Sequence, residues 1–408
     1  MATLDTEIHI TELPIEVLEH IFSYLRLADR KSVSLVCQLW NELIFSRRFM
    51  RNVALNIVMD WEHSQISVLK RSTRLYRNVF AFFGPETCCE FDFTVIIEVL
   101  DLFGATLESF HCMTNFTIDQ LWNVVTRAPN LRQLIVGVDA ASLNLDLPDF
   151  PVLQHLSDMG SLINVLRIVK LAVPNLKQLS ANFIKPDDAH ESLPFLRQVA
   201  PRLKNLELFS TEYFIPINEL RFPEVEVLKL CGRICNASDG VLKQFFLGFK
   251  CLTEVYLDFS VKGPVLDVIT KDCPEIVKLH FKTYLLDSES FRLLERLKRL
   301  KTLSLAGSID FRTTSECKPL ALRHLDQLEE LTLKCIHTPV AFMLSNKSLR
   351  RLKIKYFHNL TDADLYKLSQ MYPNLKYLEV VWCRKITQSG IAKFQSQLTD
   401  CVVHHSKL

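Results

Sequence analysis

The chain has 408 residues, of which 48% are hydrophobic and only 10 are glycine, a composition that excludes a disordered or collagen-like protein. Its 48 basic and 46 acidic residues give a net charge of +2, which excludes a general electrostatic attraction to nucleic acid or to an anionic membrane. No apolar stretch approaches the ~20 residues of a membrane helix, and the first residues lack the pattern of a secretory signal. We therefore expect a chain rich in core, located in the cytoplasm, the nucleus or both, with two structural units or one elongated one.

Residues 13–51 predict three short helices. The first has Pro14 in its first turn and carries an apolar stripe at helical spacing: Val17, Leu18, Ile21, Phe22 and Leu25. Asp29 is expected to cap a second helix with Val33, Val36 and Cys37, and Trp40 begins a third apolar stripe. About forty residues are close to the lower limit for independent folding, so we expect this segment to complete its core with another part or a partner.

The order of residues in this segment resembles an F-box. Its Leu-Pro start, its Ile-Phe pair and its Val-Cys-x-x-Trp run follow the family pattern, whereas Arg30 replaces an apolar residue and Phe49-Met50 replaces Leu-Trp. The resemblance implies docking onto a Skp-type adaptor and, through it, a cullin-based ubiquitin ligase. The residues implied to make or support this interface are Leu13, Pro14, Ile21, Phe22, Leu25, Val36, Cys37 and Trp40. The alternative is an ordinary amphipathic start of a larger helical domain.

A repeated pattern, apolar-x-x-apolar-x-apolar, runs through the remainder of the chain. Successive copies start about 21 to 28 residues apart, within the leucine-rich-repeat range of roughly 20–29. The clearest copies begin at Leu131, Leu176, Leu203, Val225, Leu252, Ile276, Leu300, Leu328, Leu349 and Leu375, and weaker ones begin at Leu107, Leu153 and Leu398.

Each copy predicts a short strand with inward-pointing leucines, followed by a helix or loop that returns behind it. One repeat cannot bury its apolar face alone, so stacked repeats must share a continuous core. The pattern resembles the cysteine-containing subtype of leucine-rich repeat, in which Thr361 and Thr387 would be helix N-caps. The predicted fold is α/β: a three-helix F-box followed by a curved solenoid of about twelve repeats, with parallel strands on its concave face and helices on its convex face.

We expect an F-box at residues 8–52, a linker with a degenerate capping or first repeat at 53–103, and the repeat domain at 104–408. In the middle segment, Val79 and Ala81 indicate an extra strand. Phe80, Phe82 and Phe83 are expected to cover the open end of the core.

No catalytic constellation is present in the sequence, which has no phosphate-binding loop, dinucleotide fingerprint, zincin motif or nucleophile elbow. The twelve cysteines are scattered in apolar runs without metal-ligand spacing, so we expect reduced thiols and no metal or cofactor. The sequence therefore predicts no catalytic residue and a non-enzymatic role.

Function is expected on the concave sheet, where residues alternate with the inward leucines. Basic side chains are frequent there, which suggests an acidic or phosphorylated protein substrate. The candidate substrate-binding residues are Tyr256, Lys278, Lys282, Lys334, Arg351, Lys353, Lys355 and Tyr377. The alternative is that alternating charges only keep this face solvated.

Together these features predict the substrate-recognition subunit of a Skp–cullin–F-box ubiquitin ligase that directs proteasomal degradation of a protein substrate, without nucleic-acid or membrane partners. Two alternatives are a scaffold that does not direct ubiquitination and a repeat regulator of another enzyme. The final Ser406-Lys407-Leu408 matches a peroxisomal address, which we interpret as a coincidence because the preceding residues predict a last strand.

Overall fold

The computed structural model describes residues 10–58, 61, 63–72, 74–82, 93–138, 152–158, 173–183, 186–210, 220–232, 238–282, 290–307, 325–334 and 346–406. The chain divides into two compact units, one formed by Met1–Gln154 with Leu171–Val173 and the other by His155–Lys170 with Pro174–Leu408. No helix of the described residues is both long and apolar enough to cross a membrane.

The first unit begins with helices that enclose a small core of their own. A 3₁₀ turn, η1 (Ile10–Glu12), precedes α1 (Ile15–Ser23), α2 (Leu27–Val33), α3 (Gln38–Ile44) and α4 (Arg47–Met50). The rings of Phe22 and Trp40 pack edge to face with their centroids 5.2 Å apart. The buried cluster around them contains Leu18, Phe22, Trp40, Leu43, Ile44 and Phe49.

Three local expectations for these helices are wrong. Pro14 is the N-cap of α1, with an extended ψ of 147°, and does not lie in its first turn. Asp29 lies in the first turn of α2, whose N-cap is Arg26, and its carboxylate accepts a hydrogen bond from Arg26 Nε at 3.1 Å. A carboxylate there still favours the helix, because the helix dipole is positive at that end. Helix α2 ends at Val33, so Val36 lies in the connection to α3.

The remainder of the first unit consists of alternating strands and helices. They are β1 (Ala54–Val58), α5 (His63–Lys70), β2 (Asn78–Phe82), α6 (Phe93–Phe103), η2 (Gly104–Thr106), β3 (Ser109–Phe116), α7 (Ile118–Arg127) and β4 (Gln133–Val138). The four strands pair in parallel in sequence order.

The second unit repeats the same design. Its strands are β5 (His155–Asp158), β6 (Gln178–Phe183), β7 (Asn205–Ser210), β8 (Val227–Gly232), β9 (Glu254–Ser260), β10 (Lys278–Lys282), β11 (Thr302–Ala306), β12 (Glu330–Lys334), β13 (Arg351–Lys355), β14 (Tyr377–Val381) and β15 (Val402–Ser406). Its helices are α9 (Pro186–Val199), η3 (Ala200–Arg202), α10 (Asp239–Phe246), α11 (Gly263–Asp272), η5 (Ser290–Arg296), α12 (Asp362–Met371) and α13 (Gln388–Gln397). These strands also pair in parallel and in sequence order.

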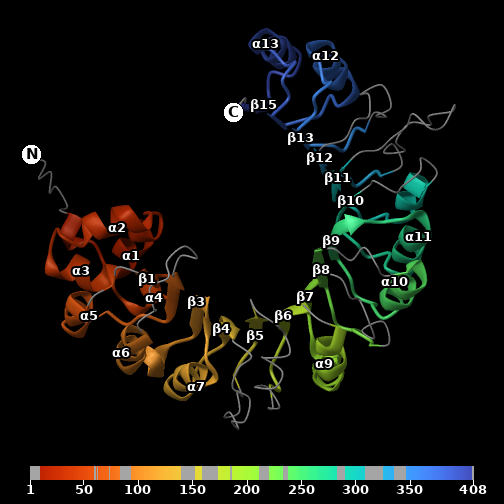
Figure 1. Ribbon diagram of the computed structural model, residues 1–408. Helices are drawn as coiled ribbons and strands as arrows, with labels where there is room; N and C mark the ends of the chain where they lie inside the picture. The colour runs from red at the N-terminus through yellow and green to blue at the C-terminus, as the bar shows by residue number, and fades with distance from the viewer. Residues whose placement is uncertain are drawn as a thin grey trace, which may run out of the picture. The chain divides into compact units, whose positions relative to one another are not determined.

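The core consists of rows of leucines in register across neighbouring strands. Leu279, Leu303, Leu331, Leu352 and Leu378 align across β10 to β14, and each is at most 1% exposed. Within a unit the helices between the strands lie against one side of the sheet (Figure 1). The side chains that alternate with the leucines point to the other side, which we call the open face. The predicted parallel-strand repeat fold is confirmed.

The repeat pattern extends further toward the N-terminus than its clearest copies. Val79 and Ala81 are buried in β2 as predicted, whereas Phe80 and Phe82 lie on the opposite face, with the Phe80 ring 4.6 Å from that of His111. Their expected role as an end cap is wrong, because β1 pairs with the outer edge of β2. Phe83 lies outside the described residues.

Predicted helix caps and the last strand are also present. Thr361 forms a capping box with Asp364, and the Thr387 side chain accepts a hydrogen bond from the Gly390 N–H at 3.1 Å. The carbonyl of Ser406 accepts a hydrogen bond from Trp382 N at 3.0 Å, so Ser406 belongs to the sheet. Lys407 and Leu408 lie outside the described residues.

Leu303→Ala should lower the free energy of unfolding by about 2–5 kcal/mol, because it removes a fully buried side chain and leaves a cavity in the row of leucines. Thr302→Ala, one residue away on the opposite side of the same strand, is the matched control and should change it by less than about 0.5 kcal/mol. Urea unfolding followed by circular dichroism measures both, and equal effects would contradict the assigned register.

Candidate functional site

An apolar surface covers the N-terminal helices and the connection between α2 and α3. Leu35 is 85% exposed and Val36 is 60% exposed. Neighbouring apolar side chains with this much exposure are typical of a surface that a partner covers. The exposed apolar residues of this surface are Ile15, Val17, Ile21, Tyr24, Leu27, Leu35, Val36 and Leu39. We call it the apolar helix surface.

The residues implied by the F-box resemblance separate into two groups. Ile21, Pro14 and Val36 are exposed. Phe22 and Trp40 are only 2% and 8% exposed and hold the helices together. The other three, Leu13, Leu25 and Cys37, are partly buried against the same core. Only the exposed group can contact a partner directly in this conformation, and the buried group positions it.

Sequence reasoning missed Leu35, Tyr24 and Leu27, which are among the most exposed apolar side chains of this surface. A signal for Leu35 was present, because it stands beside Val36 where α2 has already ended and no helical face can bury both. Tyr24 is the C-cap of α1, and Leu27 starts α2, so neither belongs to a regular apolar stripe.

The comparison with protein families matches this part of the chain. Residues 10–56 fit the family model described as F-box-like. The chain carries an F-box-like domain in front of a leucine-rich-repeat solenoid.

Solved structures offer only distant likenesses to the whole chain. The yeast Rad7–Elc1 complex matches with 14% identity and a TM-score of 0.49, covering 94% of this chain and 96% of that one. LegL7 from Legionella pneumophila matches with 13% identity and a TM-score of 0.37, covering 85% and 98%. At these values the likenesses carry no information on what the chain binds.

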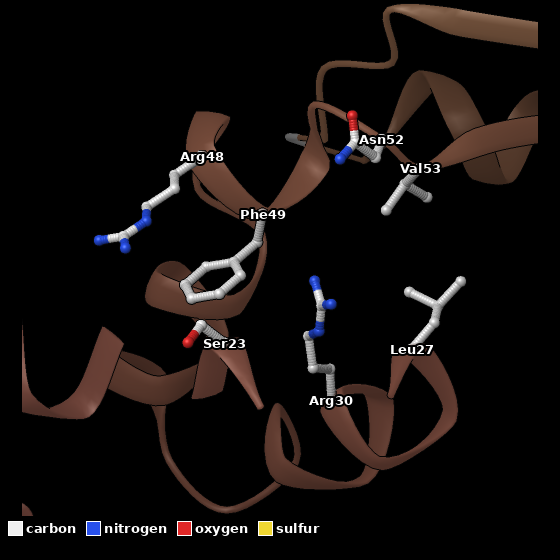
Figure 2. A pocket seen from close by; sticks show the side chains of 7 residues that line it. All are labelled: Ser23, Leu27, Arg30, Arg48, Phe49, Asn52 and Val53. Atoms are coloured by element: carbon white, nitrogen blue, oxygen red, sulfur yellow. The ribbon is translucent and has the colours of Figure 1, made fainter. Parts of the chain in front are cut away.

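The two departures from the F-box pattern contact each other. The Arg30 guanidinium lies 5.3 Å from the centroid of the Phe49 ring, and Arg48 lies 5.9 Å from the same ring. Figure 2 shows these side chains around a cavity of about 290 Å³ whose lining also includes Ser23 and Leu27. Arg30 is held by a 2.9 Å hydrogen bond from Nε to the Leu25 carbonyl. Arg30 and Phe49 therefore make a cation–π contact within this domain.

Charges on the open face of the second unit are largely neutralised in pairs across neighbouring strands. The Lys278–Glu254 and Lys282–Asp258 pairs have N–O distances of 2.7 and 2.8 Å. The Lys353–Glu330 and Lys355–Glu379 pairs have distances of 2.5 and 2.7 Å. Four of the six predicted basic residues thus have a carboxylate partner, which reduces the net positive charge of the surface.

The other two cations, Lys334 and Arg351, have no ion pair among the described residues. Lys334 Nζ lies 5.9 Å from the centroid of the Tyr356 ring, and Arg351 is exposed. Tyr377 lies opposite Arg351 on β14. The positive charge of the predicted patch therefore remains at two positions on β12 and β13.

The two aromatic residues that follow β13 and β14 have strained backbone. Tyr356 and Trp382 follow β13 and β14 with φ of 61° and 59°, in the left-handed region where Gly232 and Gly307 stand at the ends of other strands. A side chain in this region costs roughly 1–2 kcal/mol, which glycine would avoid. The two rings stack with their centroids 6.1 Å apart. Sequence reasoning missed this pair, although both residues directly follow a strand in the cysteine-containing repeats.

A second aromatic pair lies on the same face. Tyr256 and His280 stack in parallel with their centroids 4.1 Å apart, and His280 Nδ1 lies 2.7 Å from Ser304 Oγ. Burial lowers the pKa of His280 to about 4; the charges of Lys282 and Lys334 also lower it, and Asp258 raises it. His280 is consequently neutral at pH 7, and the candidate residue Tyr256 stacks on an uncharged ring.

Because the folded-state pKa of His280 lies below the ordinary value of 6.5, unfolded chains bind an extra proton as the pH falls from about 6.5 to about 4. The stability contributed by neutral His280 should therefore be complete above pH 6.5 and lost through this window. His280→Gln should flatten the fall of the urea midpoint between pH 7.5 and pH 4.5. Tyr256→Phe, which keeps the stacked ring, should retain the wild-type fall, and equal slopes in all three proteins would contradict the pKa shift.

Proposed function

We propose that this protein is the substrate-recognition subunit of a Skp–cullin–F-box ubiquitin ligase. The observation that carries the proposal is the apolar helix surface on a domain that fits the F-box-like family model. Exposure of apolar side chains such as Leu35 and Val36 to water is unfavourable. The free energy falls when a partner covers them. A Skp-type adaptor is the partner that the F-box resemblance implies, and a cullin would join through it.

The protein would contribute no catalytic residue of its own. Ubiquitin transfer would occur on other subunits, and this chain would raise the local concentration of a substrate near them. The parallel-strand repeats suit this role, because a sheet with one open face offers an extended surface on rigid elements.

Leu35→Glu with Val36→Glu should weaken adaptor binding at least tenfold, which corresponds to about 1.4 kcal/mol or more, because charged groups would be buried in an apolar interface. Co-purification and calorimetry with a Skp-type adaptor measure the change. These two positions are better targets than Phe22, which is 2% exposed and whose truncation would damage the domain itself.

Leu247→Glu is the matched control, since Leu247 is also exposed, at 41%, but lies at the end of α10 in the second unit. It should leave adaptor binding unchanged. Failure of the well-folded wild-type protein to bind the adaptor would refute the ligase proposal.

We further propose that the substrate binds across the open face of β12 to β14. Arg351 and Tyr377 lie at the starts of β13 and β14, and Lys334, Tyr356 and Trp382 lie at the other ends of these strands. Two unneutralised cations beside aromatic rings favour an acidic or phosphorylated segment with an apolar neighbour. The other predicted residues, Lys278, Lys282, Lys353 and Lys355, would shape the surface as neutral pairs, and Tyr256 would add a second aromatic contact.

Lys334→Glu with Arg351→Glu should weaken binding of glutamate-rich and phosphoserine peptides roughly tenfold, measured by fluorescence anisotropy at 150 mM salt. Lys278→Gln with Glu254→Gln removes a complete ion pair without changing the net charge and should alter binding less than twofold. Equal loss in both double variants would show that unpaired charge does not define the site.

An adaptor-bound scaffold that does not direct ubiquitination is the second candidate function. Substrate turnover distinguishes it from the first. If the protein is a ligase receptor, substrate turnover requires the apolar helix surface. If it is a scaffold, changes to that surface leave substrate turnover unaltered. A regulator of another enzyme is separated from both by the absence of adaptor binding.

A further inference from the structure

Arginine side chains gather around a cavity in the first unit that shares no residue with the apolar helix surface. The cavity has a volume of about 320 Å³. Its polar lining consists of Arg47, Arg77, Thr106, Glu108, Asn130 and Arg132. Three cations and one carboxylate give this lining a net charge of +2. This equals the net charge of the whole chain of 408 residues, so positive charge is concentrated at the cavity.

The repeat geometry brings three of these side chains together. Arg77, Glu108 and Arg132 each stand directly before a strand, at the start of β2, β3 and β4. The Arg77 carbonyl accepts a hydrogen bond from Glu108 N at 2.7 Å, and the Glu108 carbonyl accepts one from Arg132 N at 2.8 Å. Because parallel strands lie about 4.8 Å apart, equivalent side chains emerge next to one another.

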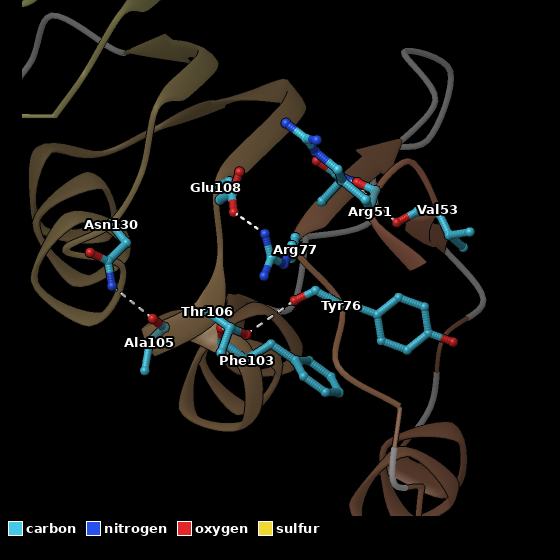
Figure 3. A network of polar contacts seen from close by, with 10 residues as sticks. Arg51, Val53, Tyr76, Arg77, Phe103, Ala105, Thr106, Glu108 and Asn130 are labelled. Carbon is cyan, nitrogen blue, oxygen red and sulfur yellow. Dashed lines mark hydrogen bonds and ion pairs between the residues drawn. The ribbon is translucent and has the colours of Figure 1, made fainter. Parts of the chain in front are cut away.

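Glu108 neutralises only one of the arginines. Its carboxylate lies 2.5 Å from Arg77 Nη1, and this ion pair, drawn as a dashed line in Figure 3, holds the Arg77 side chain in place. Arg47 and Arg132 are exposed and make no ion pair or side-chain hydrogen bond with the described residues. Two guanidinium groups at the rim of the cavity are therefore available to a ligand.

Some cations at the same position before a strand of the second unit have carboxylate partners. Lys204 pairs with Glu226, and Lys301 pairs with Glu329, at N–O distances of 2.8 and 3.0 Å. Each of these four residues directly precedes a strand. In the first unit Glu108 pairs with Arg77, so Arg132 has no carboxylate partner among the described residues, and α4 adds Arg47.

Neighbouring polar groups shape the cavity without neutralising it. Asn130 Nδ2 donates a hydrogen bond to the Ala105 carbonyl at 2.8 Å, and Thr106 Oγ1 donates to the Phe103 carbonyl at 3.0 Å. Figure 3 shows the Asn130–Ala105 contact and a second contact of Thr106 Oγ1, with the Tyr76 carbonyl at 3.3 Å, near the Arg77–Glu108 pair. They fix the turn that ends at Thr106, so this part of the lining is held in place by hydrogen bonds.

We propose that this cavity binds a phosphate-bearing anion. Guanidinium groups form paired N–H···O bonds with phosphate oxygens, and a phosphate carries enough charge to match the +2 of the lining. A volume of about 320 Å³ lies at the lower end of small-ligand sites, which suits a compact anion. Arg47 belongs to the F-box-like domain and Arg77 and Arg132 to the repeats, so the bound anion would tie these two parts of the first unit together.

The test uses the full-length chain and two probes, pyrophosphate and a phosphoserine peptide. All proteins in it carry Lys334→Glu with Arg351→Glu, so that the peptide is not taken up by the site proposed on the open face. Isothermal titration calorimetry at 150 mM salt should show saturable binding of at least one probe, with a raised thermal midpoint because the ligand binds the folded state. Arg47→Gln with Arg132→Gln should weaken that binding at least tenfold. Both side chains are exposed and unpaired, so the variant should keep the wild-type circular dichroism spectrum.

Arg51→Gln is the matched control, because Arg51 is an exposed arginine of the same segment that does not line the cavity. It should change the affinity less than twofold. Tighter binding of the peptide would identify a phosphorylated protein segment as the source of the phosphate, and tighter binding of pyrophosphate would identify a free small molecule. No saturable binding of either probe, or equal loss in the control, would overturn the proposal.

Discussion

The rows of leucines that run across the parallel strands are the interaction on which the remainder of the structure depends. A single strand-and-helix repeat has an apolar face that it cannot bury, so each repeat is stable only against its neighbours. Leu303 is fully buried because Leu279 and Leu331 lie in register on either side of it. The alternation that buries these leucines places every intervening side chain on the open face, where binding can occur.

The same register that aligns the leucines also aligns the charges. Lys278 lies directly opposite Glu254, whereas Lys353 and Lys355 reach carboxylates two residues along a neighbouring strand, at Glu330 and Glu379. Most basic side chains of the open face are neutralised in this way by a neighbouring strand. Candidate binding positions are therefore the cations without an ion-pair partner among the described residues, at Lys334 and Arg351 in the second unit and at Arg47 and Arg132 in the first.

In the F-box-like domain, a short motif carries two different physical roles. Phe22 and Trp40 form the core, and this core holds the helices so that Ile21, Leu35 and Val36 remain exposed. A motif match alone does not distinguish the residues that contact a partner from those that support them. The Arg30–Phe49 contact illustrates a related point, since two residues that depart from the pattern meet in space.

The sequence by itself determined the element types and their order. These features depend on residues that are close together along the chain. Leucine spacing predicted the repeats and the caps at Thr361 and Thr387, and the Ile-Phe and Val-Cys-x-x-Trp runs predicted the helical N-terminus. Tertiary structure decided which cations are paired, that Phe80 and Phe82 lie on the open face, that Tyr356 stacks on Trp382 and that three arginines meet around one cavity. These facts depend on side chains more than twenty residues apart, and strand register brings such residues together without leaving a local signal in the sequence.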